Sequence, residues 1–115
     1  MLKKVTNIFQ KKRHRCLQEW DINFETLQKM TKDGATLVDV RSIQEYNEGH
    51  LYGAIHLADY EISVKHNNLL PNKNAIIIVY CQNGGRSKKS CKKLKKLGYQ
   101  KIYNLCGGLD NINNF

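Results

Sequence analysis

The sequence has few of the features that would place it in a membrane or among secreted, disulfide-bonded proteins. Its 115 residues contain no apolar run long enough to span a bilayer, and the N-terminus lacks the apolar core of a signal peptide. There is one proline, and the four cysteines form neither a C-x-x-C pair nor a zinc-finger spacing with histidine. We therefore expect a cytoplasmic protein with no membrane partner, no metal site and no disulfide framework.

Acidic residues are also scarce, and the charge is unevenly distributed. The formal net charge is +9; residues 1–15 contain six Lys or Arg and residues 86–101 contain eight, and neither segment contains an acid. Such blocks attract anionic substrates or acidic proteins, but solvated lysines give the same composition, so charge alone does not identify a partner. We expect no nucleic-acid binding, because no aromatic residues interleave the basic ones and no base-reading module is present.

The length is that of one domain with a modest core. We interpret residues 1–18 as a basic N-terminal arm and residues 19–115 as the folded domain. Segments with strand and helix patterns alternate, which predicts an α/β fold with an open, mainly parallel five-stranded sheet and helices on both faces. Strands are expected at residues 20–23, 36–41, 54–57, 75–80 and 101–105, helices at 24–32, 42–48, 59–70 and 86–97, and a short tail after 107–108. We expect Asn23 to cap the first of these helices, and Ser42 with Glu45 to form a capping box at the start of the second.

The segment from Cys81 to Ser87 has the strongest chemical signal. It follows the apolar run 75–80 and precedes a lysine-rich stretch with helical periodicity, which predicts a loop between a buried strand and a helix. Gly84 and Gly85 allow such a loop to turn tightly with its N–H groups pointing inward, and the helix N-terminus adds a positive dipole end. This environment favours a thiolate on Cys81, which can attack a substrate without a general base.

Other residues near this loop are expected to support it. Arg86 brings a permanent, planar cationic group that is suited to oxyanions. Asp39 and Arg41 alternate at the end of another strand, and we expect Asp39 to organise N–H groups of the loop. Cys106 ends a strand expected next to that of Cys81; it could resolve an oxidised Cys81, although packing is the favoured role.

Four blocks of the sequence resemble the rhodanese family of sulfurtransferases, over about residues 20–112. The blocks are Leu37-Val38-Asp39-Val40-Arg41; Glu45-Tyr46 with Gly49-His50-Leu51 and Gly53 to Leu57; Ile77 to Ser87; and Leu97-Gly98-Tyr99 with Leu105 to Leu109. The resemblance implies that Cys81 takes sulfur from thiosulfate or a persulfide, becomes a persulfide and passes the sulfur to cyanide or a thiol. No cofactor is implied beyond that covalent persulfide. The substrate-binding residues implied are Gln82, Asn83, Gly84, Gly85, Arg86 and Ser87.

Two alternatives remain open. The first is a sulfur-relay or redox protein of low turnover, whose basic faces dock an acidic partner protein. The second is a cysteine-based phosphatase or arsenate reductase of the same fold. Those enzymes use C-x5-R, whereas Cys81 and Arg86 are spaced as C-x4-R, and the shorter loop leaves less room for a tetrahedral oxyanion. The spacing therefore favours sulfur transfer.

Overall fold

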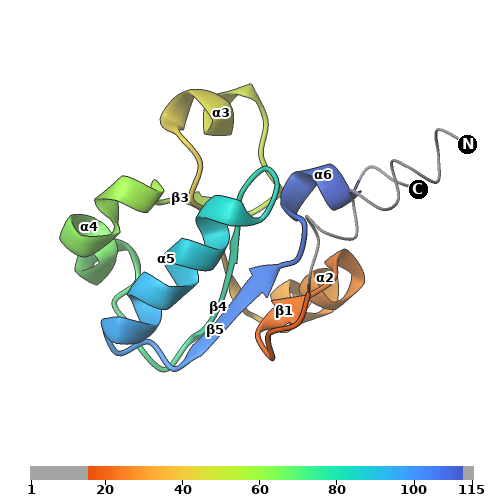
Figure 1. The fold of residues 1–115 in the computed structure, drawn as a ribbon. Helices are drawn as coiled ribbons and strands as arrows, with labels where there is room; N and C mark the ends of the chain where they lie inside the picture. The colour runs from red at the N-terminus through yellow and green to blue at the C-terminus, as the bar shows by residue number, and fades with distance from the viewer. Residues whose placement is uncertain (1–15, 113–115) are drawn as a thin grey trace, which may run out of the picture.

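The computed structural model describes residues 16–112, which form one five-stranded sheet flanked by helices (Figure 1). The strand order is β1-β5-β4-β2-β3, and every neighbouring pair is parallel. This confirms the predicted α/β fold. In chain order the elements are β1 (Asp21–Ile22), α2 (Phe24–Lys32), β2 (Thr36–Asp39), α3 (Ile43–Glu48), β3 (Ile55–His56), the 3-10 helix η1 (Asp59–Glu61), α4 (Ile62–Leu69), β4 (Ile76–Tyr80), α5 (Gly85–Lys96), β5 (Lys101–Leu105) and α6 (Gly108–Ile112).

Alternate residues of the sheet contribute to two cores on its opposite faces. Ile77 and Val79 of β4 pack in one cluster with Leu94 of α5. Ile78 packs in the other cluster with Leu27 of α2, and α6 adds residues to that same face. Successive side chains of a strand point to opposite faces, so the continuous apolar run of β4 is explained by burial on both sides. The helices thus enclose β4, at whose end Cys81 lies.

Two helices begin at the caps that the sequence predicts. The Asn23 side chain accepts a hydrogen bond from the backbone N–H of Thr26 at 2.8 Å, at the start of α2. Ser42 and Glu45 form a reciprocal capping box at the start of α3. Because α3 directly follows β2, this cap fixes α3 at the carboxyl edge of the sheet, on the same edge as Cys81 (Figure 1).

Two segments differ from the predicted elements. The expected helix at 59–70 is divided into η1 and α4. The expected tail after the Gly107-Gly108 pair is instead the short helix α6, reached through backbone angles φ of +77° and +61° that favour glycine. Within residues 16–112, no helix has both the length and the apolar character needed to cross a bilayer.

The expectation that the cysteines form no disulfide was wrong for one pair. Cys16 is joined to Cys106, with 5.8 Å between their Cα atoms and a sequence separation of 90. Because β1 and β5 are neighbouring strands, the segment that leads into β1 lies against β5. Cys81 and Cys91 are buried free thiols, so the partner of Cys106 is Cys16 rather than Cys81. Residues 1–15 of the proposed arm lie outside the described residues.

Candidate active site

Cys81 lies immediately after β4, at the carboxyl edge of the parallel sheet, where ligands bind in open α/β folds. The residue is fully buried. Its Sγ accepts hydrogen bonds from the backbone N–H groups of Gly84 at 3.1 Å and Ser87 at 3.4 Å, and lies 3.4 Å from Ser87 Oγ. These donors belong to the loop and to the first turn of α5. A negative charge on the sulfur is therefore stabilised by two N–H groups and by the positive end of the helix.

The conformation of the loop depends on Gly84 and Asn83. Gly84 has φ of +97°, a left-handed conformation that costs other residues free energy. The exposed Asn83 accepts a hydrogen bond from the N–H of Gly85 at 2.9 Å through Oδ1. That bond turns the Gly85 N–H away from the sulfur, so the hydrogen bonds to Sγ come from Gly84 and Ser87. The structure thus brings together all of the loop residues that the sequence singled out.

The loop is supported from behind by α6, through contacts that the sequence did not predict. The N–H of Leu109 donates to the Cys81 carbonyl at 3.1 Å, and the N–H of Asp110 donates to the Gln82 carbonyl at 2.9 Å. A Cβ atom on Gly108 would overlap both of those carbonyl oxygens. The Gly-Gly pair was the available signal, since glycine is needed where two backbones approach closely.

Arg41 and Asp39 form a buried ion pair beside the loop. Arg41 Nη2 lies 2.8 Å from Asp39 Oδ2, and the exposed fractions of the two side chains are 5% and 0%. The expectation that Asp39 organises the N–H groups of the loop was wrong, because its carboxylate instead accepts from the backbone N–H and the guanidinium of Arg41. Arg41 Nη1 donates to Gln82 Oε1 at 3.3 Å. Arg41 therefore supports the loop through the Gln82 side chain.

Arg86, at the end of the loop, is held by Glu45 of α3. Its Nη1 and Nη2 atoms donate to the two carboxylate oxygens of Glu45 at 2.7 and 3.0 Å. Glu45 Oε1 also accepts from the backbone N–H of Ser42 at 3.1 Å. The hydrogen bonds from Arg86, followed by those from Ser42, outweigh desolvation and lower the pKa of Glu45 to about 2. The sequence predicted Glu45 as a capping residue but not as the partner of Arg86.

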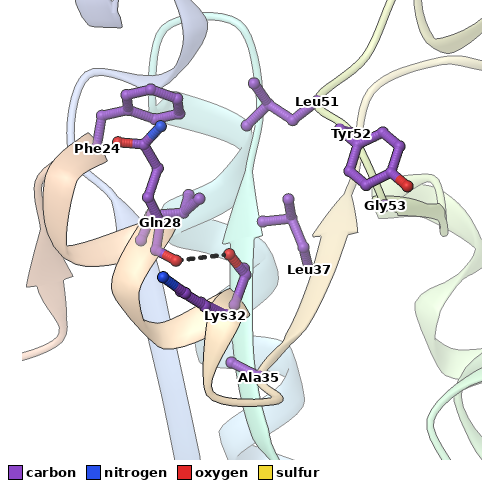
Figure 2. A pocket seen from close by; sticks show the side chains of 10 residues that line it. Phe24, Gln28, Lys32, Ala35, Leu37, Leu51, Tyr52 and Gly53 are labelled. Atoms are coloured by element: carbon purple, nitrogen blue, oxygen red, sulfur yellow. Dashed lines mark hydrogen bonds between the residues drawn. The ribbon is translucent and has the colours of Figure 1, made fainter.

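Cavities in the described part of the chain lie both at the carboxyl edge of the sheet and on the α2 face. A shallow one of about 280 Å³ borders the loop at Gln82. A larger groove of about 470 Å³ lies between α2 and the loop that precedes β3 (Figure 2). None of its lining residues belongs to the Cys81 loop, so it is separate from the thiol chemistry. Among residues 16–112, no group of three His, Cys, Asp or Glu side chains is arranged to hold a metal ion. The labelled residues of the groove are Phe24, Gln28, Lys32, Ala35, Leu37, Leu51, Tyr52 and Gly53.

Comparison with known proteins places these features in a family. The sequence model described as "Rhodanese-like domain" matches residues 23–114. The putative sulfur carrier protein YrkF of Bacillus subtilis (strain 168) is 34% identical over 83 residues, which cover 71% of this chain and 44% of that protein. The chain therefore spans less than half the length of that relative.

Two smaller proteins match over most of their length. The thiosulfate sulfurtransferase GlpE of Ectopseudomonas mendocina (strain ymp) is 30% identical over 91 residues, which cover 77% of this chain and 80% of that protein. The solved structure of the human single-domain sulfurtransferase TSTD1 has the same fold, with a TM-score of 0.72 at 21% identity, over 83% of this chain and 96% of that one. The chain belongs to the rhodanese-like domain family.

Proposed function

We propose that the protein is a sulfurtransferase that holds transferred sulfur as a persulfide on Cys81. The Cys81 thiolate attacks the terminal sulfur of the donor and forms a new S–S bond. The bond between that sulfur and the rest of the donor breaks, and its electron pair leaves with the donor; from thiosulfate the product is sulfite. An acceptor thiolate or cyanide then attacks the outer sulfur, and Cys81 leaves as a thiolate. Each step conserves charge and needs no cofactor.

The observation that supports this proposal is a buried sulfur with two backbone N–H donors. Gly84 and Ser87 donate to Sγ, while Cys81 itself has no exposed surface. The loop from Cys81 to Arg86 is also one residue shorter than the C-x5-R loop of the phosphatases and leaves less room for a tetrahedral oxyanion around the sulfur. This spacing favours sulfur transfer over the phosphatase alternative.

The test is the intact mass of the protein, with its Cys16–Cys106 disulfide kept intact, before and after treatment with thiosulfate or a small persulfide. We expect the wild type to gain one sulfur atom and Cys81→Ser to gain none. Cys91→Ser is the matched control, because burial raises the pKa of the Cys91 thiol to about 12 and keeps it protonated. That variant should load as the wild type does. Failure of every donor to load the wild type, or loading of Cys81→Ser, would refute the proposal.

A second candidate function, a sulfur relay between proteins, is favoured by the surface of α5. Lys89, Lys92 and Lys96 are exposed on the helix that begins at the Cys81 loop. This positive surface would orient an acidic donor or acceptor protein over the loop. The relative YrkF is named as a sulfur carrier, which agrees with such a role.

The relay differs from the small-donor enzyme in its rates and in their dependence on salt. A relay exchanges sulfur slowly with thiosulfate and rapidly with an acidic protein persulfide, and the second rate falls more steeply as salt increases. Lys89→Glu should slow the exchange between proteins and leave thiosulfate loading unchanged. Lys32→Glu, on α2 at the opposite face of the sheet, is the matched control and should change neither rate. Equal effects of the two substitutions would argue against the relay.

A further inference from the structure

Both arginines that flank the Cys81 loop in the described residues are paired with carboxylates. Arg41 is held by Asp39, and Arg86 is held by Glu45. Their charges are therefore neutralised locally, and a donor that enters the site meets no uncompensated guanidinium from either residue. This differs from the cationic site that the loop sequence alone predicts.

We propose that Glu45 sets the donor selectivity of the site, by holding Arg86 so that singly charged sulfane sulfur donors, such as persulfides, are preferred over the thiosulfate dianion. The inference rests on the proposed function, since it concerns which donor delivers sulfur to Cys81. In this scheme Glu45 touches neither the donor nor the sulfur. It acts through Arg86 as a positioning residue.

The geometry of the pair explains how one carboxylate can have this effect. Glu45 binds Nη1 and Nη2 of Arg86 together, and these are the atoms with which a guanidinium would bind an oxyanion. Glu45 is fixed from behind by the N–H and Oγ of Ser42 at the start of α3. The carboxylate therefore belongs to a helix cap and does not leave the guanidinium without disturbing that cap. A dianion that competes for Arg86 must displace Glu45.

This selectivity can be measured with two donors that differ mainly in charge, thiosulfate and methanethiosulfonate. Methanethiosulfonate is thiosulfate with one anionic oxygen replaced by a methyl group. Cys81 takes the terminal sulfur from either donor, with the same S–S bond formed and the same kind of S–S bond broken. Sulfite leaves from thiosulfate, and methanesulfinate leaves from methanethiosulfonate. The ratio of kcat/KM for thiosulfate to kcat/KM for methanethiosulfonate therefore reports how the site treats the additional charge.

Four variants complete a charge cycle for this ratio. Glu45→Gln frees the guanidinium and should raise the ratio by roughly five- to tenfold, the effect of a unit charge near the site at an intermediate effective dielectric constant. Arg86→Gln leaves the carboxylate unpaired and should lower the ratio by a similar factor. The double variant should return it to within about twofold of the wild type. Glu48→Gln removes the same charge from an exposed position of α3 and should leave the ratio unchanged.

Glutamine is an accepted residue at the third position of a capping box, so Glu45→Gln keeps the cap of α3. Glu45→Asp is an additional variant at the same position. The shorter aspartate side chain keeps the charge but cannot reach both Nη atoms of Arg86. It should raise the ratio in the same direction by a smaller factor. Of the two, Glu45→Gln tests the pairing with Arg86 independently of the capping hydrogen bond.

If Arg86 instead binds the donor directly in the wild type, the ratios of kcat/KM values for the variants should differ from those given above. Glu45→Gln would then leave the ratio unchanged, and the double variant would be as low as Arg86→Gln; either result overturns the inference. A rise in Glu48→Gln equal to that in Glu45→Gln would also overturn it, because the effect would then be one of net charge. Intact mass distinguishes failure of the proposed function from failure of the role of Glu45. If neither donor loads Cys81, the proposed function fails. If both donors load Cys81 and the ratio of kcat/KM values does not change in Glu45→Gln, only the role of Glu45 is refuted.

Discussion

Replacement of Gly108 by alanine tests whether α6 supports the Cys81 loop. A Cβ atom at this position would overlap the Cys81 carbonyl oxygen and would lie 2.6 Å from the Gln82 carbonyl oxygen. Both contacts are with backbone atoms, which cannot rotate away as a flexible side chain would. The backbone of the loop or of α6 must therefore move.

The expected cost has two parts. Alanine at φ of +61° adopts a left-handed conformation, which costs about 1 to 2 kcal/mol. Relief of the overlap adds about 1 to 3 kcal/mol, as is typical of overpacking. We therefore expect the free energy of unfolding to fall by roughly 2 to 5 kcal/mol. Because the displaced atoms belong to Cys81 and Gln82, sulfur loading should slow at least tenfold, which corresponds to about 1.4 kcal/mol in the barrier.

Gly53→Ala is the matched control for the conformational part. Gly53 has φ of +81°, and a Cβ atom there would have no neighbour within 4 Å. Urea denaturation should give a smaller loss of stability for Gly53→Ala than for Gly108→Ala, and the intact-mass assay should show normal loading for Gly53→Ala. Equal losses in the two variants, or normal loading of folded Gly108→Ala, would refute the role assigned to the contact between α6 and the loop.

Three further predictions concern charge and covalent stabilisation. Arg41→Gln leaves the fully buried Asp39 carboxylate unpaired, so the free energy of unfolding in urea should fall by roughly 3 to 5 kcal/mol, and the double variant with Asp39→Asn should recover part of that loss. The pKa of Glu45 is depressed, so the stability that its charged form contributes is complete above the ordinary pKa of 4.5 and is lost as pH falls toward about 2. The difference in Tm between the wild type and Glu45→Gln should therefore shrink over that range. A constant difference would contradict the pairing of Glu45 with Arg86. Reduction of the Cys16–Cys106 disulfide should lower the free energy of unfolding by roughly 2 to 4 kcal/mol, with no such effect of the reductant on Cys16→Ser.

The sequence predicted the features that depend on neighbours in the chain. The apolar run before Cys81 and the glycines after it are local signals, and they predicted β4, the loop and α5. Asn23 and the pair of Ser42 and Glu45 act within three residues of one another, and their caps were predicted correctly. Such patterns are set by backbone hydrogen bonding at helix ends, which requires no knowledge of the rest of the fold.

The contacts that the sequence did not predict join distant segments. Glu45 and Arg86 are 41 residues apart, and Cys16 and Cys106 are 90 apart. Both pairings follow from a strand order that places β4 between β5 and β2 and places β1 beside β5. Alternation of strands and helices predicts a parallel sheet but not its strand order. The Gly107-Gly108 pair likewise predicted a turn, but not which backbone it would meet.

The support of the loop by α6 has a consequence for the order in which the Cys81 loop is assembled. A growing chain that ends just after the Cys81 loop lacks Leu109 and Asp110, whose N–H groups bind the carbonyls of that loop. The contact between Gln82 and Asp110 closes a segment of only 28 residues, so its entropic cost is modest once β5 has joined the sheet. The carbonyl groups of Cys81 and Gln82 therefore gain these partners only when the last strand and helix dock, so the backbone of the loop reaches its final support late in folding.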